Sequence, residues 1–333
     1  MLKGLLVVVV VPPLLNTAGL AREREVLQEN LTRVDLGAGQ WAWLQCEGRG
    51  QPIVLLEAGT GEAGDSWIEV QAALAPLTRV CRYDRAGLGH SDLRPAEMDG
   101  AGPGSREGSA GRLAGELSAL LAAGVGLGAE PLVLVGRGLG ASVVRLFAAR
   151  EPERSVELVL VEPLPDTLFE TGEPEVGGWV EHWARLTTSL RLLQLAAMLG
   201  LTRLGLLTGL LTAPTSTAKH RLCDPWHLQA VLAEHTSAAE SARQARAAQM
   251  ARPLVSPVTI LTGSQYDPEL PAALNTAWAA AVRRLADSLG PVCRLQQVEG
   301  ELASPAHQAT LLQPVVRAVQ DWRARHHPGG GQL

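Results

Sequence analysis

A chain of 333 residues is long enough to bury a large core. Its composition, with 46% hydrophobic and 19% charged residues, is typical of a globular protein. The formal net charge of −5, with no basic run, argues against nucleic acid as a partner. None of the four cysteines forms a C-x-x-C pair, so no metal or other cofactor is predicted and no disulfide framework is implied. Cys46, Cys81 and Cys293 lie in or beside predicted strands, where we expect them to be small buried apolar side chains.

The chain opens with a hydrophobic segment over residues 1–21. Its apolar run from Gly4 to Leu15 contains Pro12 and Pro13 and is shorter than the roughly 20 residues that cross a bilayer. Three interpretations stay open: a signal peptide or signal anchor, a hydrophobic arm lying on a surface, and a packed first segment of the fold. The segment slightly favours a membrane or the secretory pathway over the cytoplasm.

The next elements alternate between strand and helix. Pro52 to Glu57 is an apolar strand that runs into a glycine loop, Ala58 to Gly61. A helix is predicted from Trp67 to Leu77 and a strand from Thr78 to Tyr83. The second strand leads into Asp84-Arg85-Ala86-Gly87-Leu88-Gly89-His90-Ser91, a glycine-rich loop.

A sharp glycine turn follows another apolar strand, Pro131 to Val135. Gly136-Arg137-Gly138-Leu139-Gly140 lies between that strand and a predicted helix from Ala141 to Arg150. This is the context of a nucleophile elbow, G-x-S-x-G, but with glycine where the serine should stand. The spacing of Gly136, Gly138 and Ala141 also matches the weaker G-x-G-x-x-[GA] pattern of dinucleotide-binding turns.

The strand pattern continues over Val156 to Val161 and then stops from Leu164 to about Ala251. Within that stretch Thr188 to Leu211 is strongly apolar, which fits either cap helices packed on the core or a lid facing a lipid-like ligand or a membrane. Strands are predicted again over Pro257–Gly263 and Cys293–Val298, followed by a terminal amphipathic helix and a disordered tail over residues 326–333.

Taken together, these segments resemble the α/β-hydrolase fold family, in its esterase-like and peptidase-like branch with a D-R-x-G-x-G-x-S loop. The resemblance covers residues 31–325 and implies a mainly parallel sheet flanked by helices, with a helical cap inserted at about 164–251. A dinucleotide-binding fold would usually open with its glycine turn, whereas here three strands precede it.

The resemblance also implies site residues, in the order nucleophile, acid, histidine. Gly138 falls at the nucleophile position, Asp267 in the acid loop and His307 at the base. Glu162 is the fallback acid, because it ends the strand after the elbow helix. The oxyanion donors would be the backbone N–H groups of Thr60 and Leu139.

A triad without its nucleophile predicts a protein that is non-catalytic or very weakly active and that binds an apolar small molecule. One alternative is a weak hydrolase that uses water activated by His307 and Asp267. A second alternative is nucleotide binding through Gly136, Gly138 and Ala141. Ser142 lies a turn into the helix and is not expected to replace the missing serine. Membrane association through the N-terminal segment or the cap is a further expectation.

Overall fold

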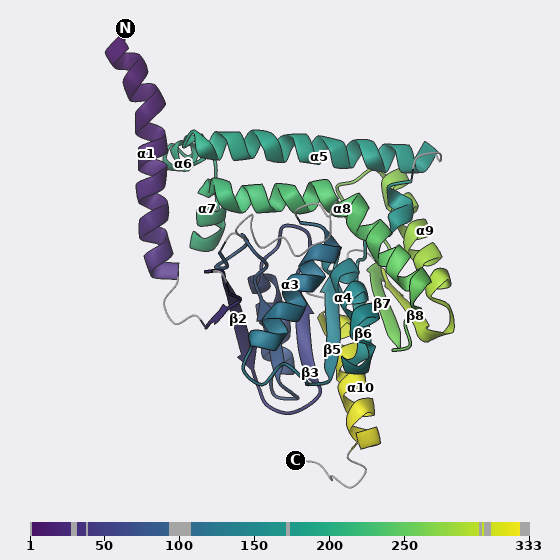
Figure 1. Ribbon diagram of the computed structural model, residues 1–333. Helices are drawn as coiled ribbons and strands as arrows, with labels where there is room; N and C mark the ends of the chain where they lie inside the picture. Colours follow the sequence, from purple (N-terminus) through teal and green to yellow (C-terminus); the bar gives the residue numbers. More distant parts are fainter. Residues whose placement is uncertain are drawn as a thin grey trace.

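The computed structural model describes residues 2–27, 32–37, 39–92, 108–170, 174–299, 302 and 308–326. At its centre is an eight-stranded sheet in the order β1-β2-β4-β3-β5-β6-β7-β8 (Figure 1). β1 and β2 are antiparallel to their neighbours, and the other strands are parallel to one another. The strands are β1 (Arg33–Asp35), β2 (Trp41–Glu47), β3 (Ile53–Glu57), β4 (Val80–Tyr83), β5 (Leu132–Arg137), β6 (Ser155–Val161), β7 (Val258–Gly263) and β8 (Cys293–Val298).

The central strands are buried on both faces because helices cover the sheet on each side. In β3, Ile53 and Leu55 point into one core while Val54 and Leu56 point into the other, as the period of two requires. The first core is closed by α3 (Ala110–Ala123), α4 (Leu139–Arg150) and α9 (Ala272–Leu289), and the second by α2 (Ile68–Leu74) and α10 (Gln308–His326). This architecture confirms the predicted mainly parallel α/β fold.

Four helices make up the cap between β6 and β7, in the segment where the strand pattern stops. They are α5 (Pro174–Met198), α6 (Leu201–Leu207), α7 (Ser216–Cys223) and α8 (Pro225–Ala251). α8 packs on α3 and α4, and α5 packs on α8, so α5 forms the outermost layer of the cap (Figure 1). α8 begins at a capped turn, in which Asp224 accepts hydrogen bonds from the N–H groups of Trp226 and His227.

The hydrophobic N-terminal segment is part of a long helix, α1 (Leu2–Leu27), which continues through both prolines. Its second half packs against α6 and α7 through buried polar contacts. Asn16 Nδ2 donates to the carbonyl oxygens of Ala197 and Cys223, at 3.0 and 2.8 Å. The Arg203 guanidinium donates to both carboxylate oxygens of Glu23, at 2.8 and 2.9 Å.

The membrane-spanning capacity of the described helices is limited. No single one of them combines the length and apolar composition needed to cross a bilayer. The bent pair Gly178–Met198 and Leu201–Leu207, with an 80° bend, has enough apolar length when the two helices are taken together.

The expectation about two of the cysteines was wrong. Cys46 in β2 and Cys81 in β4 are directly opposite in the antiparallel register and form a disulfide. Cys223 is a buried free thiol and Cys293 a half-buried one. Of the predicted tail, His326 ends α10, and residues 327–333 lie outside the described residues.

Candidate active site

Gly138 occupies a sharp turn between a buried strand and a buried helix. β5 ends at Arg137 and α4 begins at Leu139, so the chain reverses direction within one residue. Gly138 has φ 53° and ψ −114°, and its N–H donates to the carbonyl oxygen of Val161 at 3.0 Å. A strand, a strained turn with positive φ and a helix are the defining geometry of a nucleophile elbow.

The two flanking glycines are required by packing. A Cβ on Gly136 would lie 2.5 Å from the carbonyl oxygen of Gly140. A Cβ on Gly140 would lie 2.5 Å from the carbonyl oxygen of Ala58. Both distances are shorter than any real contact, so neither position accepts a side chain unless the backbone moves.

The central glycine is different. A Cβ on Gly138 would have its nearest neighbours at 3.8 Å, namely Gly59 Cα and Thr60 N, with Thr60 Oγ1 at 3.9 Å. These are ordinary van der Waals distances. A Cβ at the apex of the turn would therefore have room, and Thr60 would be its nearest polar neighbour.

The predicted oxyanion donors belong to the same turn and its neighbouring loop. Leu139 is the first residue of α4, a position whose N–H has no partner within the helix ladder. The Thr60 N–H lies across from Gly138 on the loop that follows β3. These two backbone N–H groups thus lie beside Gly138, where the resemblance predicts the oxyanion donors.

A buried arginine fixes that loop. Arg85 donates to the carbonyl oxygens of Ala58 and Gly59, at 2.8 and 2.5 Å, and to Glu57 Oε1 at 2.6 Å. It also forms a two-pronged ion pair with Glu234 of α8, at 2.7 and 2.8 Å. Burial lowers the pKa of Arg85, but Glu234 and Glu57 outweigh burial and hold the pKa well above its usual value.

Glu234 links the cap to the same loop. Besides the pair with Arg85, its Oε2 accepts a hydrogen bond from the Gly61 N–H at 2.7 Å. In the sequence, the loop Asp84–Ser91 stands out only as part of the family resemblance, and nothing there indicates that Arg85 pairs with Glu234. Arg85 and Glu234 are 149 residues apart, so no local pattern connects them.

A cavity of about 550 Å³ lies over Gly138. Its floor comes from the core: Gly59, Thr60, Glu62, Arg137, Gly138 and Glu162. Its walls come from the cap and from the loop after β7: Trp179, His182, Trp183, Leu186, His235, Tyr266, Asp267, Glu269 and Leu270. The cavity opens at the carboxyl ends of the strands, where open α/β sheets bind their ligands.

The structure brings four of the sequence-predicted residues together around this cavity: Gly138, Thr60, Asp267 and Glu162. Leu139 lies directly behind them and is buried. His307, the predicted base, lies outside the described residues, as do residues 303–306 before it.

The two candidate acids have different surroundings. Asp267 Oδ1 accepts the Glu269 N–H at 2.8 Å, so this half-buried carboxylate stabilises its own turn. Glu162 is buried, has φ 46° and lies 3.7 Å from Arg137 Nε. Arg137 also lies 3.4 Å from Glu62 Oε1, which gives the cavity floor alternating charges.

The cap residues of the cavity were missed in the sequence. Trp179, His182, Trp183 and Leu186 follow the i, i+3, i+4, i+7 spacing of one helix face, which was a readable signal. The Trp183 ring stacks on His235 of α8 with a centroid distance of 4.2 Å. Burial lowers the pKa of His235 to about 4, so this imidazole is neutral at neutral pH.

Two serines that the sequence analysis or the neighbouring loops single out lie away from the cavity in the described residues. Ser142 is buried within α4 and does not line the cavity. Ser91 accepts the Trp43 N–H and donates to the carbonyl oxygen of Asp84, a structural role. In the part of the lining that the structure describes, the hydroxyls belong to Thr60 and Tyr266, and none comes from serine. Burial raises the pKa of Tyr266 to about 12, so its phenol stays protonated.

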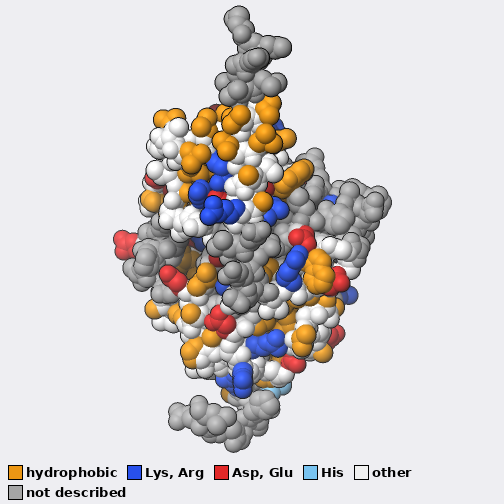
Figure 2. Space-filling view, turned by 90° about the vertical axis from the view of Figure 1, so that its left-hand side faces the viewer, with side chains coloured by type: hydrophobic (Ala, Val, Ile, Leu, Met, Phe, Trp, Pro, Cys, Tyr) orange, Lys and Arg blue, Asp and Glu red, His pale blue; other side chains and the backbone are white. Residues whose placement is uncertain are grey.

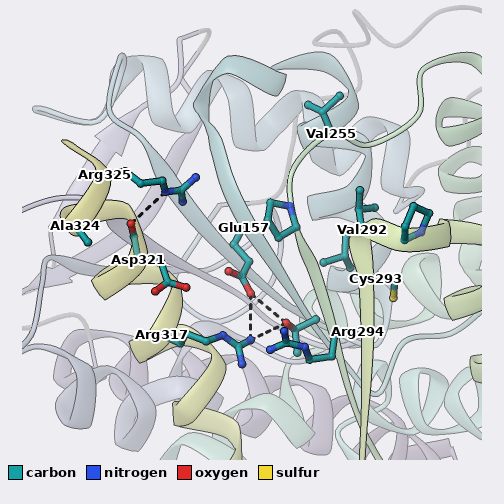
Figure 3. Close-up of a pocket in the computed structure, with 13 residues that line it drawn as sticks. Glu157, Val255, Val292, Cys293, Arg294, Arg317, Asp321, Ala324 and Arg325 are labelled. Atoms are coloured by element: carbon teal, nitrogen blue, oxygen red, sulfur yellow. Dashed lines mark hydrogen bonds and ion pairs between the residues drawn. The ribbon is translucent and has the colours of Figure 1, made fainter.

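A larger cavity, of about 710 Å³, lies at the opposite end of the parallel strands from Gly138, and Figure 3 shows its lining residues. It is bordered by the first residues of β6, β7 and β8 and by α10. Here Arg317 lies 3.6 Å from Glu157 Oε1 and donates to Thr259 Oγ1 at 3.2 Å. Because it lies at the amino ends of the strands, this cavity contains none of the elbow residues and is not the candidate active site.

The packing of the glycine turn is compatible with the nucleotide-binding alternative as well as with the elbow. Gly136 is packed against the backbone of Gly140, and Ala141 is 1% exposed. A dinucleotide-binding turn would pack these two positions in the same way and place the pyrophosphate at the central glycine, so nucleotide binding stays a prediction.

Comparison with known proteins agrees with this geometry. The model of the α/β hydrolase fold family matches residues 51–288. Among curated proteins, "Putative carbamate hydrolase RutD" of Klebsiella pneumoniae is 38% identical over 113 residues, which are 34% of this chain and 38% of that protein. An "AB hydrolase superfamily protein" of Gibberella zeae is 30% identical over 148 residues, 41% of each chain. The chain therefore matches only about two fifths of the length of these relatives.

Solved structures extend the likeness over most of the chain. The epoxide hydrolase CorEH superposes with a TM-score of 0.61 at 17% identity, covering 88% of this chain and all of that one (100%). An identity this low shows a common fold and nothing finer. The family match, which spans more than half of the chain, carries the conclusion: this protein belongs to the α/β hydrolase fold family.

Proposed function

We propose that this protein is an α/β hydrolase whose triad is broken at Gly138, and that it binds a small molecule without ordinary esterase turnover. The observation that carries the proposal is the space beside Gly138, where a Cβ would meet nothing closer than 3.8 Å. Acyl transfer on this fold needs an oxygen at that apex to attack the carbonyl carbon. Loss of a serine nucleophile costs roughly a factor of 10⁶ in kcat in a well-studied hydrolase, which leaves little activity.

The lining of the cavity fits an amphipathic ligand with a large apolar part. Trp179, Trp183 and Leu270 contribute apolar walls, and the charged floor lies beneath them.

The variant Gly138→Ser tests the proposal. With a retained oxyanion cradle and a working base, the new hydroxyl should raise hydrolysis of p-nitrophenyl butyrate by at least about 100-fold over the parent. Gly138→Ala is the matched control, because it adds the Cβ without an oxygen. A parent that hydrolyses the ester as fast as Gly138→Ser would contradict the proposal.

A second candidate function is weak hydrolysis by a water molecule that His307 and Asp267 activate. The position of Asp267 on the cavity wall favours it. Its turn-stabilising hydrogen bond with Glu269 weighs against it, because one carboxylate oxygen is already engaged. Under this second candidate, Asp267→Asn and His307→Gln each abolish a slow hydrolysis that Gly138→Ala leaves unchanged.

A further inference from the structure

α1 carries four exposed apolar side chains between residues 10 and 15. Val10, Val11, Leu14 and Leu15 are 42%, 40%, 63% and 51% exposed. From Gly4 to Leu15 the sequence contains no charged or polar side chain, so this part of the helix has no hydrophilic side. A helix that is apolar all round belongs in a protein core or in hydrocarbon rather than in water.

A second exposed apolar surface lies beside it, at the corner where α5 leads into α6. Six of its side chains are between 43% and 84% exposed: Leu192, Leu195, Met198, Leu204, Leu207 and Leu210. α6 contacts α1, so the two surfaces adjoin, and we call them together the apolar face. Figure 1 shows α1 running across the end of α5, with its first half extending past it.

The contacts of α1 hold the two parts of the apolar face in a fixed relation. Arg203 of α6 pairs with Glu23 and also donates to Asn16 Oδ1 at 3.0 Å. The Arg203 side chain also fills the space beside Gly19, where a Cβ would lie 2.4 Å from the guanidinium carbon. The backbone of Gly200 lies against Pro12, because a Cβ there would be 2.2 Å from the Pro12 carbonyl oxygen.

Two ion pairs border the apolar face, and in each the basic side chain is more exposed than its acidic partner. Arg24 is 51% exposed while its partner Asp224 is 8% exposed. Lys219 is 42% exposed while its partner Glu23 is 19% exposed. On the face that carries α1, Figure 2 shows hydrophobic side chains gathered over the upper part of the coloured surface, with lysine and arginine side chains below them.

From these observations we propose that the apolar face docks on a lipid bilayer containing anionic headgroups. The first half of α1 enters the acyl region, and the α5–α6 corner lies along the interface. The basic border meets the headgroups, which attract Lys and Arg near a membrane surface. A bilayer fits better than a protein groove, because a groove can cover only one side of a helix that is apolar all round.

Vesicle flotation of the full chain tests the proposal. The parent should float with vesicles of phosphatidylcholine and phosphatidylserine and float less with phosphatidylcholine alone. The double variant Leu207→Glu/Leu210→Glu should reduce binding at least about tenfold, since two exposed leucines would lose their place in the interface. Val125→Glu is the matched control, because Val125 is 90% exposed but lies in the turn after α3, and it should bind as the parent does.

The electrostatic part has its own variant. Arg22 is exposed, and Arg22→Gln should weaken binding to the phosphatidylserine vesicles about fivefold while leaving binding to phosphatidylcholine unchanged. Thermal unfolding of each variant checks that the fold is intact.

Three outcomes overturn the proposal. In the first, the parent would not float with the vesicles. In the second, the double variant would float as well as the parent. In the third, vesicle binding would be absent, and light scattering would show a dimer of the parent that the double variant does not form. The last outcome would assign the apolar face to a second copy of this chain. None of these readouts depends on Gly138, so the proposal stands or falls separately from the proposed function.

Discussion

Three glycines within five residues of the elbow have different physical reasons to be there. Gly136 and Gly140 are glycine because backbone oxygens occupy the space of a Cβ, at 2.5 Å in each case. Gly138 has that space free and is set apart only by its φ of 53°. Such a sparsely populated backbone conformation costs a non-glycine residue roughly 1–3 kcal/mol, a strain that a nucleophile elbow normally contains. The apex of the turn therefore has space for a Cβ, which the two flanking positions do not.

This difference predicts a ranking of alanine variants. Gly136→Ala and Gly140→Ala should each lower the free energy of unfolding by about 3 kcal/mol or more, because the Cβ collides with backbone. Gly138→Ala should cost less than either, about 1–3 kcal/mol, because only the strain of its backbone conformation opposes the new Cβ. Urea denaturation of the three variants measures the ranking.

Gly115 supplies the control for that series. It lies inside α3, and its nearest neighbour to a new Cβ is the Arg150 guanidinium at 4.0 Å. Gly115→Ala should stabilise the protein by about 0.5–1 kcal/mol. A Gly138→Ala variant that is as unstable as Gly136→Ala would show that the apex has closed and cannot hold a nucleophile.

At the scale of elements, α8 is the connection between cap and core. Its Glu234 and the core residue Arg85 have side chains only 3% and 2% exposed, and both also bind the loop over Gly138. An ion pair buried this deeply is sensitive to the loss of one partner, since the other charge is then left in a medium of low polarity.

Replacement of Glu234 should therefore damage the cap–core junction. We expect Glu234→Ala to lower the free energy of unfolding by about 3–5 kcal/mol, because among the described residues Arg85 then keeps Glu57 alone as a charged partner. Arg243→Ala, which removes an ion pair with Glu240 whose arginine is 59% exposed, should cost less than about 1 kcal/mol. Equal effects of the two variants in denaturant melts would contradict this role of Glu234.

The docking of α1 should depend on pH. The two hydrogen bonds from Arg203 hold the pKa of Glu23 at about 2, below its ordinary value of 4.5. A carboxyl whose pKa is lower in the folded state contributes stability above pH 4.5, and this contribution is lost as the pH falls toward 2. Hydrogen exchange over residues 10–24, corrected for intrinsic rates, should accelerate as the pH is lowered through this range.

Glu23→Gln is the control for that measurement. This variant should exchange faster than the parent near neutral pH and show a smaller further change on acidification. Parent and variant with the same pH dependence would mean that the carboxylate does not hold α1 in place.

At the scale of the whole molecule, the α/β fold was predictable because the central strands carry their own signal. β3 and β5 are short apolar segments with proline before them and glycine after or at their ends, and the elbow glycines follow β5 directly. The order of these segments along the chain then limits the fold to a parallel sheet with crossover helices.

The site was predictable only where one short segment contains it. Gly138, Thr60 and Asp267 each follow a strand, so their gathering at one end of the sheet could be expected. The Arg85–Glu234 pair and the Cys46–Cys81 disulfide depend on tertiary packing and on the register of β2 against β4, which no local pattern specifies. Trp183 and His235 come from two cap helices whose packing is equally non-local.

The most direct test of a broken triad is covalent labelling by a fluorophosphonate, followed by intact mass spectrometry. The parent chain should keep its mass. Gly138→Ser should gain the mass of one probe molecule less HF, because fluoride leaves as the serine oxygen attacks phosphorus and gives up its proton. A labelled parent whose label disappears in Thr60→Val would contradict the account, because the cavity would then hold a working nucleophile without a serine at position 138.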